Sequence, residues 1–404
     1  MSEVNTVETK KVRKVHHTGR TSQVWIYLGK QFRFFINEND WKVLPMAAII
    51  AGLVAMVIRK KFFVNMEGSL IGAFALACVG IWNGCFNSIQ TVCRERAIIK
   101  REHRSGMHIS AYMAAHMIYQ FLLCAAQTVL TMFVMRQLSV PIPRNYGSGI
   151  ITPWMICDLG ITMFLITYAA DMMSLFLSSI SRTTTSAMTL MPFILIFQLV
   201  FSGGIIPLPE WSRPLSNFTI SNYGIRALAS QSGYNELPMT TVWNTVSGMK
   251  SSTIGGDFTV AELMEKLDSP GIEKFKDRVV LGTITVGDAE AALGLEKSEN
   301  ADEALTNPVT VGQVVEILKN SEYLNEHRDK VISLKTTVGD VLDIIGEENV
   351  KNFVQRKTAE AAHKPEYECT PKNIIRNWAM LGVFIAVFAA LATLMLELID
   401  KDKR

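Results

Sequence analysis

Residues 93–112 read CRERAIIKREHRSGMHISAY, and this charged stretch stands between two long apolar blocks. Its charged side chains recur at helical spacing, and the charged part ends near Gly106, a residue type that often follows a helix. The next apolar block begins almost at once. We therefore expect a short helix at 93–110 that projects charged side chains from a membrane surface, where a soluble partner protein can bind it. The alternative is an ordinary basic loop of a membrane protein.

The apolar blocks around this stretch are long enough to cross a bilayer. The chain has 404 residues, of which 49% are hydrophobic, and this is too apolar for a soluble domain of ordinary composition. A transmembrane helix needs about 20 apolar residues to cross about 30 Å of hydrocarbon. Blocks of this kind lie at 41–58, 68–92, 111–136, 152–180, 185–202 and 373–398. We expect six transmembrane helices, and Pro192 predicts a kink in the fifth.

The basic residues set the expected orientation. They are concentrated before the first block, in the 93–110 stretch, at Arg182 and in the tail Lys401–Arg404. Because cytoplasmic segments carry an excess of Lys and Arg, both termini of this multi-pass protein are expected in the cytoplasm, and 203–372 outside the cytoplasmic membrane. The cluster Arg59–Lys61 goes against this rule. The first forty residues are polar and basic, so no secretory signal is expected there.

The chain before the first span divides into two parts. Residues 1–20 are polar and basic, and we expect them to form a disordered cytoplasmic tail. Within 21–40, the apolar residues Trp25, Leu28 and Phe32 recur at helical spacing, and basic residues lie off that stripe. This pattern predicts an amphipathic helix along the cytoplasmic surface of the membrane. An ordinary packed helix is the alternative.

The stretch that follows the fifth span is neither a span nor a free loop. Gly203 and Gly204, with Pro207 and Pro209 after them, interrupt the helix, and a moderately apolar sequence continues to 231. Irregular backbone at membrane depth must be buried in protein or line a wet cavity. We therefore expect short re-entrant helices at 203–231.

Residues 232–372 form a segment of opposite charge. They hold 24 acidic and 15 basic residues, a net charge of −9 in a chain whose total is +3. We expect an acidic, mainly helical domain outside the cytoplasm. Cys369 is its one cysteine, so an internal disulfide is impossible, and this thiol either joins two copies or stays free.

The acidic segment contains an internal duplication. Four Thr-Val pairs recur 25–27 residues apart, and each threonine is followed three residues later by Glu, Asp or Gln, the pattern of a helix capping box. The four threonines, which we expect to be structural caps, are Thr259, Thr285, Thr310 and Thr337. A longer repeat predicts two units, at 257–308 and 309–350.

The order of these elements resembles the permeases of ABC exporters with the G-type fold. That family has an amphipathic connecting helix, six spans, an Arg/Glu-rich coupling helix before the third span, and re-entrant helices after the fifth. The resemblance covers about 21–231 and 373–400. It implies an all-α membrane protein with spans 1–5 at 41–202 and span 6 at 373–400. The residues that it assigns to coupling with an ATPase subunit are Arg94, Glu95, Arg96, Arg101, Glu102, Arg104 and Gly106.

In the same family the second and fifth spans line a cavity between two copies. The residues that the resemblance places in this cavity are Asn83, Asn87, Phe193, Phe197, Gln198 and Phe201. Hydrogen bonding and packing between helices is the alternative for these side chains. Asp171 in the fourth span is a further candidate, with pairing or solvation as the alternative.

This chain departs from the family in two ways. It has no nucleotide-binding domain, which implies that ATP and Mg²⁺ bind a separate ATPase subunit, and its loop before the last span is expanded by about 140 residues, the length of 232–372. No phosphate-binding loop, metal-ligand cluster or Ser/His/Asp arrangement is present. We therefore expect no catalytic, cofactor-binding or metal-binding residue, and no enzyme activity of the chain by itself.

The sequence thus favours the permease subunit of an ATP-driven ABC exporter that works as a homodimer or pseudo-dimer. An amphipathic substrate, whether a lipid, a peptide or a hydrophobic metabolite, is expected, and nucleic acid is not. The first alternative is a membrane receptor or assembly anchor whose external domain binds another protein. A secondary transporter ranks third, after the exporter and the receptor or anchor. Such a transporter needs buried titratable groups in several spans, and few are present.

Overall fold

The computed structural model separates the chain into two compact units, Met1–Trp243 with Phe353–Arg404, and Asn244–Asn352. The structure describes residues 19–38, 40–204, 208–254, 257–268, 270–274, 276–277, 279–281, 299, 302, 309–320, 325–329, 331–333 and 336–398. The expected disordered tail at 1–20 and the basic C-terminal tail lie almost wholly outside these residues.

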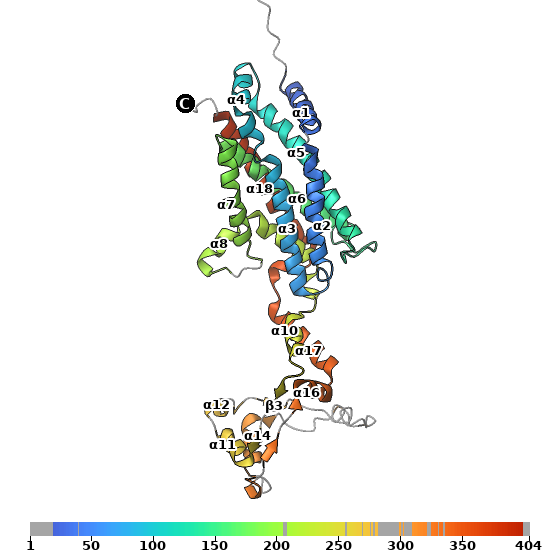
Figure 1. Ribbon diagram of the computed structural model, residues 1–404, viewed down its shortest axis with the longest axis vertical. Coiled ribbons are helices and arrows are strands. Elements are labelled where there is room, and N and C mark those ends of the chain that lie inside the picture. Colours follow the sequence, from blue (N-terminus) through green and yellow to red (C-terminus); the bar gives the residue numbers. More distant parts are fainter. Residues whose placement is uncertain are drawn as a thin grey trace, which may run out of the picture. The chain divides into compact units, whose positions relative to one another are not determined.

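The first unit is a bundle of long helices (Figure 1). Its helices run along the chain as α1 (Arg20–Asn37), η1 (Asp40–Lys42), α2 (Val43–Ile58), α3 (Met66–Ser88), α4 (Thr91–Arg104), α5 (Ile109–Gln137), α6 (Met155–Ile180), α7 (Thr184–Val200), η2 (Glu210–Ser212), α8 (Arg213–Ser216), α9 (Ile220–Gln231), η3 (Tyr234–Glu236), η4 (Pro365–Tyr367) and α18 (Pro371–Glu397). In Figure 1, α1 and α4 lie at the same end of the bundle.

Five helical segments of the described chain are long and apolar enough to cross a membrane. They are Asp40–Ile58, Met66–Arg104, Ile109–Gln137, Met155–Ile180 and Pro371–Glu397. The expected fifth span corresponds to α7, which is apolar but has 17 residues. At 1.5 Å per residue α7 is about 26 Å long, slightly shorter than the hydrocarbon core. The protein is therefore a multi-pass membrane protein, and the fifth of the six expected spans stays a prediction.

The helices pack closely because small residues line their contacts. A Cβ atom built on Gly84 of α3 would collide with the carbonyl oxygen of Thr167 and would lie 2.8 Å from the amide nitrogen of Asp171 in α6. A Cβ atom on Gly80, one turn earlier, would lie 2.9 Å from a side-chain carbon of Ile166. Without a hydrophobic driving force between helices in lipid, such close approach supplies much of the attraction. The two glycines thus fix α3 against α6.

Polar side chains add specific links inside the bundle. The indole nitrogen of Trp378 in α18 donates to the hydroxyl of Thr162 in α6 at 2.7 Å. That hydroxyl donates in turn to the side chain of Gln231 at the end of α9, at 3.0 Å. Exposed apolar side chains such as Leu53 and Val57 cover the outside of α2. The bundle is therefore polar at selected internal points and apolar on its outer surface, as a lipid environment requires.

The short helices expected after the fifth span are present as η2, α8 and α9. Almost every residue of α9 is buried, and the helix packs against α3, α6 and α18. Gln198 of α7 caps the first turn of α9, because its side-chain carbonyl accepts from the backbone amide of Ile220 at 2.8 Å. Whether this segment dips into the bilayer stays a prediction, and residues 205–207 lie outside the described chain.

The second unit combines short helices with short strands. Its elements, with those that join it to the first unit, are α10 (Thr241–Gly248), β1 (Thr253–Ile254), β2 (Asp257–Thr259), α11 (Val260–Leu267), α12 (Pro270–Glu273), β3 (Val279–Leu281), β4 (Val309–Thr310), α14 (Val311–Lys319), β5 (Val331–Ser333), β6 (Thr336–Thr337), α16 (Val338–Ile345) and α17 (Glu347–Ala362). Strands β1 and β6, β2 and β5, and β3 and β4 pair antiparallel. We did not expect these strands, because two or three residues are too few to show an alternating pattern.

The repeated threonines mark the same local structure. A strand ends at Thr259, Thr310 and Thr337, and a helix begins at the next residue each time. Thr259 and Glu262 form a capping box, and so do Thr337 and Asp340. These two caps are confirmed, Thr285 lies outside the described residues, and the two-unit duplication at 257–308 and 309–350 stays a prediction, as do the domain limits 232–372.

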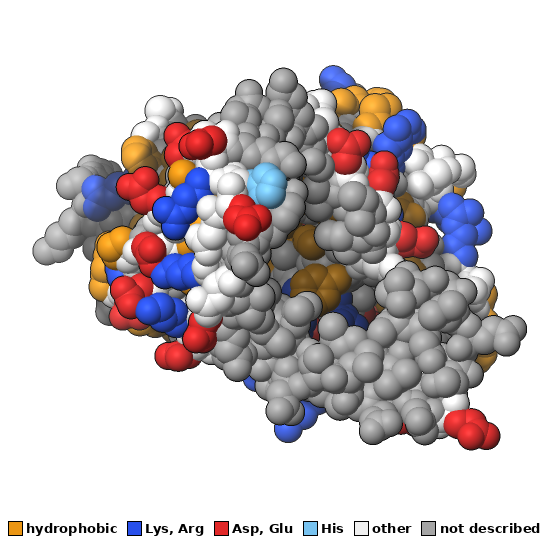
Figure 2. Space-filling model, turned by 90° about the horizontal axis from the view of Figure 1, so that it is seen from below, with side chains coloured by type: hydrophobic (Ala, Val, Ile, Leu, Met, Phe, Trp, Pro, Cys, Tyr) orange, Lys and Arg blue, Asp and Glu red, His pale blue; other side chains and the backbone are white. Residues whose placement is uncertain are grey.

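Acidic and basic side chains are mixed on the described surface seen in Figure 2. Several acidic and basic side chains of the second unit pair, as Lys250 does with Glu347 at 2.6 Å and Lys276 with Glu273 at 2.6 Å. Exposed pairs of this kind contribute little to stability, since solvent screens them. The net negative charge of the segment is thus distributed over a mixed surface.

Candidate functional site

Helix α4 continues from α3 after a break at Ile89 and Gln90 and presents two different faces. Its buried side chains, at helical spacing, are Val92, Cys93, Glu95 and Ile99. Its exposed side chains, also at helical spacing, are Arg94, Ala97, Ile98, Arg101 and Arg104. The charged stretch at 93–110 therefore contains an amphipathic helix, with one carboxylate on the buried face.

Glu95 is the centre of the buried face. Its side chain is 7% exposed and accepts from the Lys30 ammonium of α1 at 3.3 Å and from the Tyr112 hydroxyl of α5 at 3.1 Å. A buried carboxylate without such partners would cost several kcal/mol, of order 3–5. Glu95 thus joins three helices, α1, α4 and α5.

A second set of contacts ties the end of α4 to α1. The Tyr27 hydroxyl donates to Glu102 at 3.0 Å, and burial together with this carboxylate raises the pKa of Tyr27. The Gln23 side-chain amide donates to the carbonyl of Gly106 at 3.2 Å, and its oxygen accepts from the amide of His108 at 2.9 Å. Gly106 has φ 105°, a conformation that favours glycine and ends the helix. Helix α1 is therefore docked along the full length of the charged stretch.

Arg96 ties α4 to the end of α6. Its guanidinium donates to the carbonyls of Ser179 and Ser181 at 2.8 and 3.1 Å. The last carbonyls of a helix lack partners within the helix and carry partial negative charge, so a cation there is favourable. The Ser178 hydroxyl also accepts from the amides of Val92 and Cys93, both at 3.1 Å. The start of α4 is therefore fastened to the end of α6 by several hydrogen bonds.

The structure divides the seven residues that were assigned to coupling. Four of them hold α4 in place, namely Glu95, Arg96, Glu102 and Gly106. The other three, Arg94, Arg101 and Arg104, lie on the exposed face with Ile98. Arg94 pairs with Glu38 at 3.0 Å, and both side chains are 46% exposed. The exposed face of α4 is therefore basic with one large apolar side chain at its centre, a surface suited to protein contact.

The six residues that were assigned to a cavity lie in several different settings. Asn87 exchanges two hydrogen bonds with Gln127 of α5, at 2.9 and 3.0 Å. Gln198 is 2% exposed and caps α9, whereas Phe193 is 68% exposed on the outside of α7. Phe197 and Phe201 lie half-buried with ring centroids 5.0 Å apart, and Asn83 is buried. A cavity between two copies that contains all six stays a prediction.

A polar hollow of about 220 Å³ lies beside Asn87, at the end of the bundle near α4. Its polar lining includes Asp40, Arg94 and Gln120. The Gln120 side chain is 1% exposed, and its carbonyl oxygen has no hydrogen-bond partner in the described protein. An unpaired buried carbonyl is unfavourable unless a water or a ligand donates to it. The hollow is therefore a candidate site for a polar group.

Several important residues escaped the sequence analysis. Lys30 was treated as part of the basic edge of a surface helix and Gln23 was not singled out, yet each bonds a residue at least 65 positions away. Asp158 is fully buried, and its carboxylate accepts from the amides of residues 150–152 at 2.7, 3.0 and 2.8 Å. No local pattern marks the partners of Lys30 and Gln23, because the chain brings them together only after folding. The amides that Asp158 binds are close in sequence but lie in an irregular loop, which no helical or strand spacing marks.

Asp171 and the cysteines carry no site by themselves. Asp171 is fully buried, and the Cys124 thiol lies 3.6 Å from its carboxyl group. Cys369 is half-buried, and burial raises the pKa of its thiol, which lowers its reactivity. Within the described residues no three His, Cys, Asp or Glu side chains are grouped as a metal site requires. A disulfide between two copies through Cys369 stays a prediction.

Comparison with known proteins gives two findings. The model of the ABC-2 type transporter family matches residues 22–231, slightly more than half of the chain. An ABC transporter ATP-binding/permease protein from Mycobacterium tuberculosis is 26% identical over 201 residues. That match covers 47% of this chain and 23% of the relative, so the chain corresponds to less than a quarter of the longer protein.

Proposed function

Because the chain belongs to the ABC-2 type transporter family and is thus an ABC transporter permease, we propose that it is the membrane subunit of an exporter driven by a separate ATPase subunit. The relative from Mycobacterium tuberculosis is described as an ATP-binding and permease protein, with both parts in one chain. In our proposal the ATP-binding part acts here as a partner, which binds ATP and Mg²⁺.

The exposed face of α4 carries the proposal. Arg94, Ile98 and Arg101 project from it, and Ile98 is 41% exposed between the two arginines. A large apolar side chain within a ring of arginines is typical of a contact centre between proteins. Arginine also binds carboxylates in a fixed bidentate geometry. We propose that an acidic groove of the ATPase subunit receives this face.

The buried face of α4 explains how motion would reach the spans. Glu95 binds α1 and α5, and Arg96 binds the end of α6. A displacement of α4 would therefore move three other helices with it, whereas a loop with no such contacts would absorb it. ATP binding by the partner would shift the population from an inward-open to an outward-open state.

The position of α4 also supports an orientation. Charged helix faces of this kind are retained in the cytoplasm together with basic segments. We propose that both termini and α4 are cytoplasmic, that α7 forms the fifth of six spans by local thinning of the bilayer, and that residues 203–372 lie outside. Two copies would enclose the route of the substrate.

The polar hollow beside Asn87 supports an amphipathic substrate. It opens near α4, and its charged lining side chains are Asp40 and Arg94. Its apolar lining includes Phe86 of α3 and Leu123 of α5, interspersed with amide side chains such as Gln120. A molecule with a polar head and an apolar body matches such a wall, so a lipid, peptide or hydrophobic metabolite is the proposed class.

The test is purification of the full chain in mild detergent with its associated proteins, followed by measurement of ATP hydrolysis in the eluate. We expect a co-purifying ATPase. The double variant Ile98→Ala with Arg101→Ala should lower its recovery at least tenfold, since central interface residues each contribute about 1–2 kcal/mol. Lys60→Ala is the matched control, because this exposed lysine follows the end of α2 that is remote from α4.

Two outcomes would count against the proposal. An eluate without ATPase activity, in which another protein is held by residues 232–372, would favour the receptor or anchor. Equal ATPase recovery from the wild type and the double variant would remove α4 as the contact. Transport measured with proteoliposomes that contain ATP on one side would then be needed to keep any exporter assignment.

A further inference from the structure

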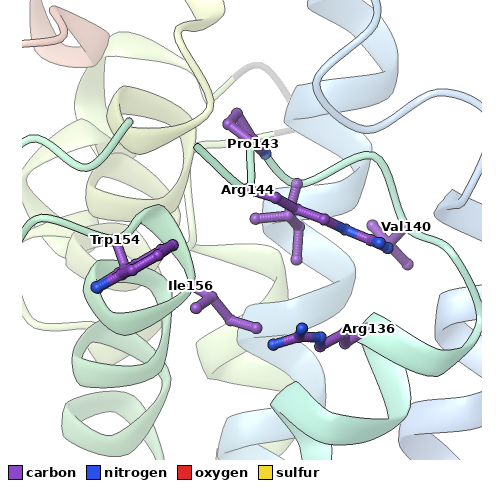
Figure 3. A pocket seen from close by; sticks show the side chains of 7 residues that line it. Arg136, Val140, Pro143, Arg144, Trp154 and Ile156 are labelled. Atoms are coloured by element: carbon purple, nitrogen blue, oxygen red, sulfur yellow. The ribbon is translucent and has the colours of Figure 1, made fainter. Parts of the chain in front are cut away.

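A small pocket lies at the end of the bundle opposite to α4, where α5 ends and α6 begins. Its volume is about 70 Å³, and its lining is Arg136, Val140, Ile142, Pro143, Arg144, Trp154 and Ile156. In Figure 3, Trp154 lies on one side of the pocket and the two arginine side chains lie on the other, with Ile156 between them. The pocket thus has a cationic wall, an aromatic wall and an apolar floor.

The two arginines make the pocket strongly positive. Arg136 is in the last turn of α5, and Arg144 is in the loop that follows. Both are exposed, and neither has an acidic partner among the residues that the structure describes. Two cations that share one small pocket repel each other, and an anion between them relieves that repulsion. The charges therefore favour an anionic ligand.

The loop around the pocket is held in shape before any ligand binds. The buried carboxylate of Asp158 accepts from three successive loop amides, those of Ile150, Ile151 and Thr152. Tyr146 packs edge-on against Trp154, with ring centroids 5.8 Å apart. Tyrosine and tryptophan gather at the level of lipid headgroups in membrane proteins. The pocket is therefore prearranged and lies at the expected depth of a headgroup.

An apolar stripe leads away from the pocket along α5. Phe133 is one turn before Arg136 and Val129 is two turns before it, so all three lie on one face of the helix. Phe133 is 55% exposed and Val129 is 70% exposed. This stripe gives a surface for acyl chains that begins beside Arg136, and a free phosphate ion would not use it.

We propose that this pocket binds the phosphate of an anionic phospholipid, whose acyl chains lie along the stripe of α5. The pocket has room for about five water positions, since one position needs about 15 Å³, and this suits a phosphate group and excludes a whole lipid. Arg136 and Arg144 would hold the phosphate through charge-assisted hydrogen bonds. The site is independent of the ATPase contact at α4.

The test is native mass spectrometry of the full chain in detergent with added phosphatidylglycerol or phosphatidylcholine. We expect tighter binding of phosphatidylglycerol. The variant Arg136→Gln with Arg144→Gln should weaken it about thirtyfold, and each single variant about fivefold. Arg136→Lys with Arg144→Lys keeps the charge and should retain most of the preference. Lys60→Gln removes a cation from the same end of the bundle and should leave it unchanged.

Three results would overturn the proposal. The first is equal binding of the two lipids by the wild-type chain. The second is a loss of preference in Lys60→Gln as large as that in the double Gln variant, which would indicate general surface charge. The third is full displacement of phosphatidylglycerol by millimolar inorganic phosphate, which would indicate a site for the free ion. A thermal unfolding scan of each variant checks that the chain is folded.

Discussion

Replacing Lys30 by methionine tests whether α1 and α4 are joined by a buried ion pair. The change removes the ammonium but keeps most of the stem. The Glu95 carboxylate, 7% exposed, would keep only the neutral Tyr112 hydroxyl at 3.1 Å as donor. Breaking a fully buried pair costs about 3–5 kcal/mol, whereas an exposed pair contributes about 0.2–1 kcal/mol.

The exposure of the two partners decides where this pair falls between those limits. Lys30 is 25% exposed, so solvent screens part of the interaction. We expect a loss of about 2–3 kcal/mol for Lys30→Met. In the double variant with Glu95→Gln the buried charge is gone, and the total loss relative to the wild type should stay below about 1 kcal/mol, because Gln still accepts from Tyr112. With a loss of about 0.5 kcal/mol for Glu95→Gln alone, which leaves a partly solvated Lys30, the coupling energy from the double-mutant cycle should be about 2 kcal/mol.

The pair of Arg94 and Glu38 is the matched control. It joins the same region at a similar distance, 3.0 Å, but both side chains are 46% exposed. Its coupling energy should be below about 1 kcal/mol and should fall further at about 1 M salt. The coupling of Lys30 and Glu95 should change little with salt, since burial protects it.

The assay is reversible unfolding of the purified chain in mixed detergent micelles, with amide exchange of residues 20–37 as a local readout. Amide exchange in this helix should accelerate in Lys30→Met and recover in the double variant. Equal coupling energies for the two pairs, or a value below about 0.5 kcal/mol for Lys30 and Glu95, would refute the reasoning from burial.

Three further predictions follow from the packing and the caps. Gly84→Ala should lower the free energy of unfolding in the same detergent assay by about 1–3 kcal/mol, because the added methyl group meets the backbone of α6. Gly382→Ala, where the added methyl group meets no atom within 4 Å, should raise it by up to about 1 kcal/mol. Equal effects of the two variants would contradict this reasoning. Asp158→Asn should cost about 1.5–3 kcal/mol and speed exchange of the three amides that it binds; unchanged exchange would show that the carboxylate charge is not needed. Hydrogen bonds from Thr337 lower the pKa of Asp340 below its ordinary 3.8. The ionised Asp340 therefore stabilises the start of α16 at higher pH, and this stabilisation is lost as pH falls through the lowered pKa. Amide exchange at the start of α16 should accelerate over that pH range, and Thr337→Ala should abolish the pH dependence.

The spans and caps show which features a sequence pattern can predict. Five of the six expected spans match helices of sufficient length, because the length of an apolar block is a local property. The caps at Thr259 and Thr337 are also local, since donor and acceptor lie three residues apart. The short strands β1–β6 were missed for the opposite reason, because each depends on a partner far along the chain.

The sequence by itself determined that this chain is a membrane protein, that a charged helix separates its second and third spans, and which family it resembles. Only the tertiary structure decided which charges of that helix are anchors and which are exposed. Glu95 and Arg94 are neighbours of opposite fate, because the rotation of α4 about its axis is set by Lys30, Tyr112 and the end of α6. Apolar periodicity can be recognised within a few helical turns of sequence. The partners of a buried charge are distant in sequence and meet only when the helices pack.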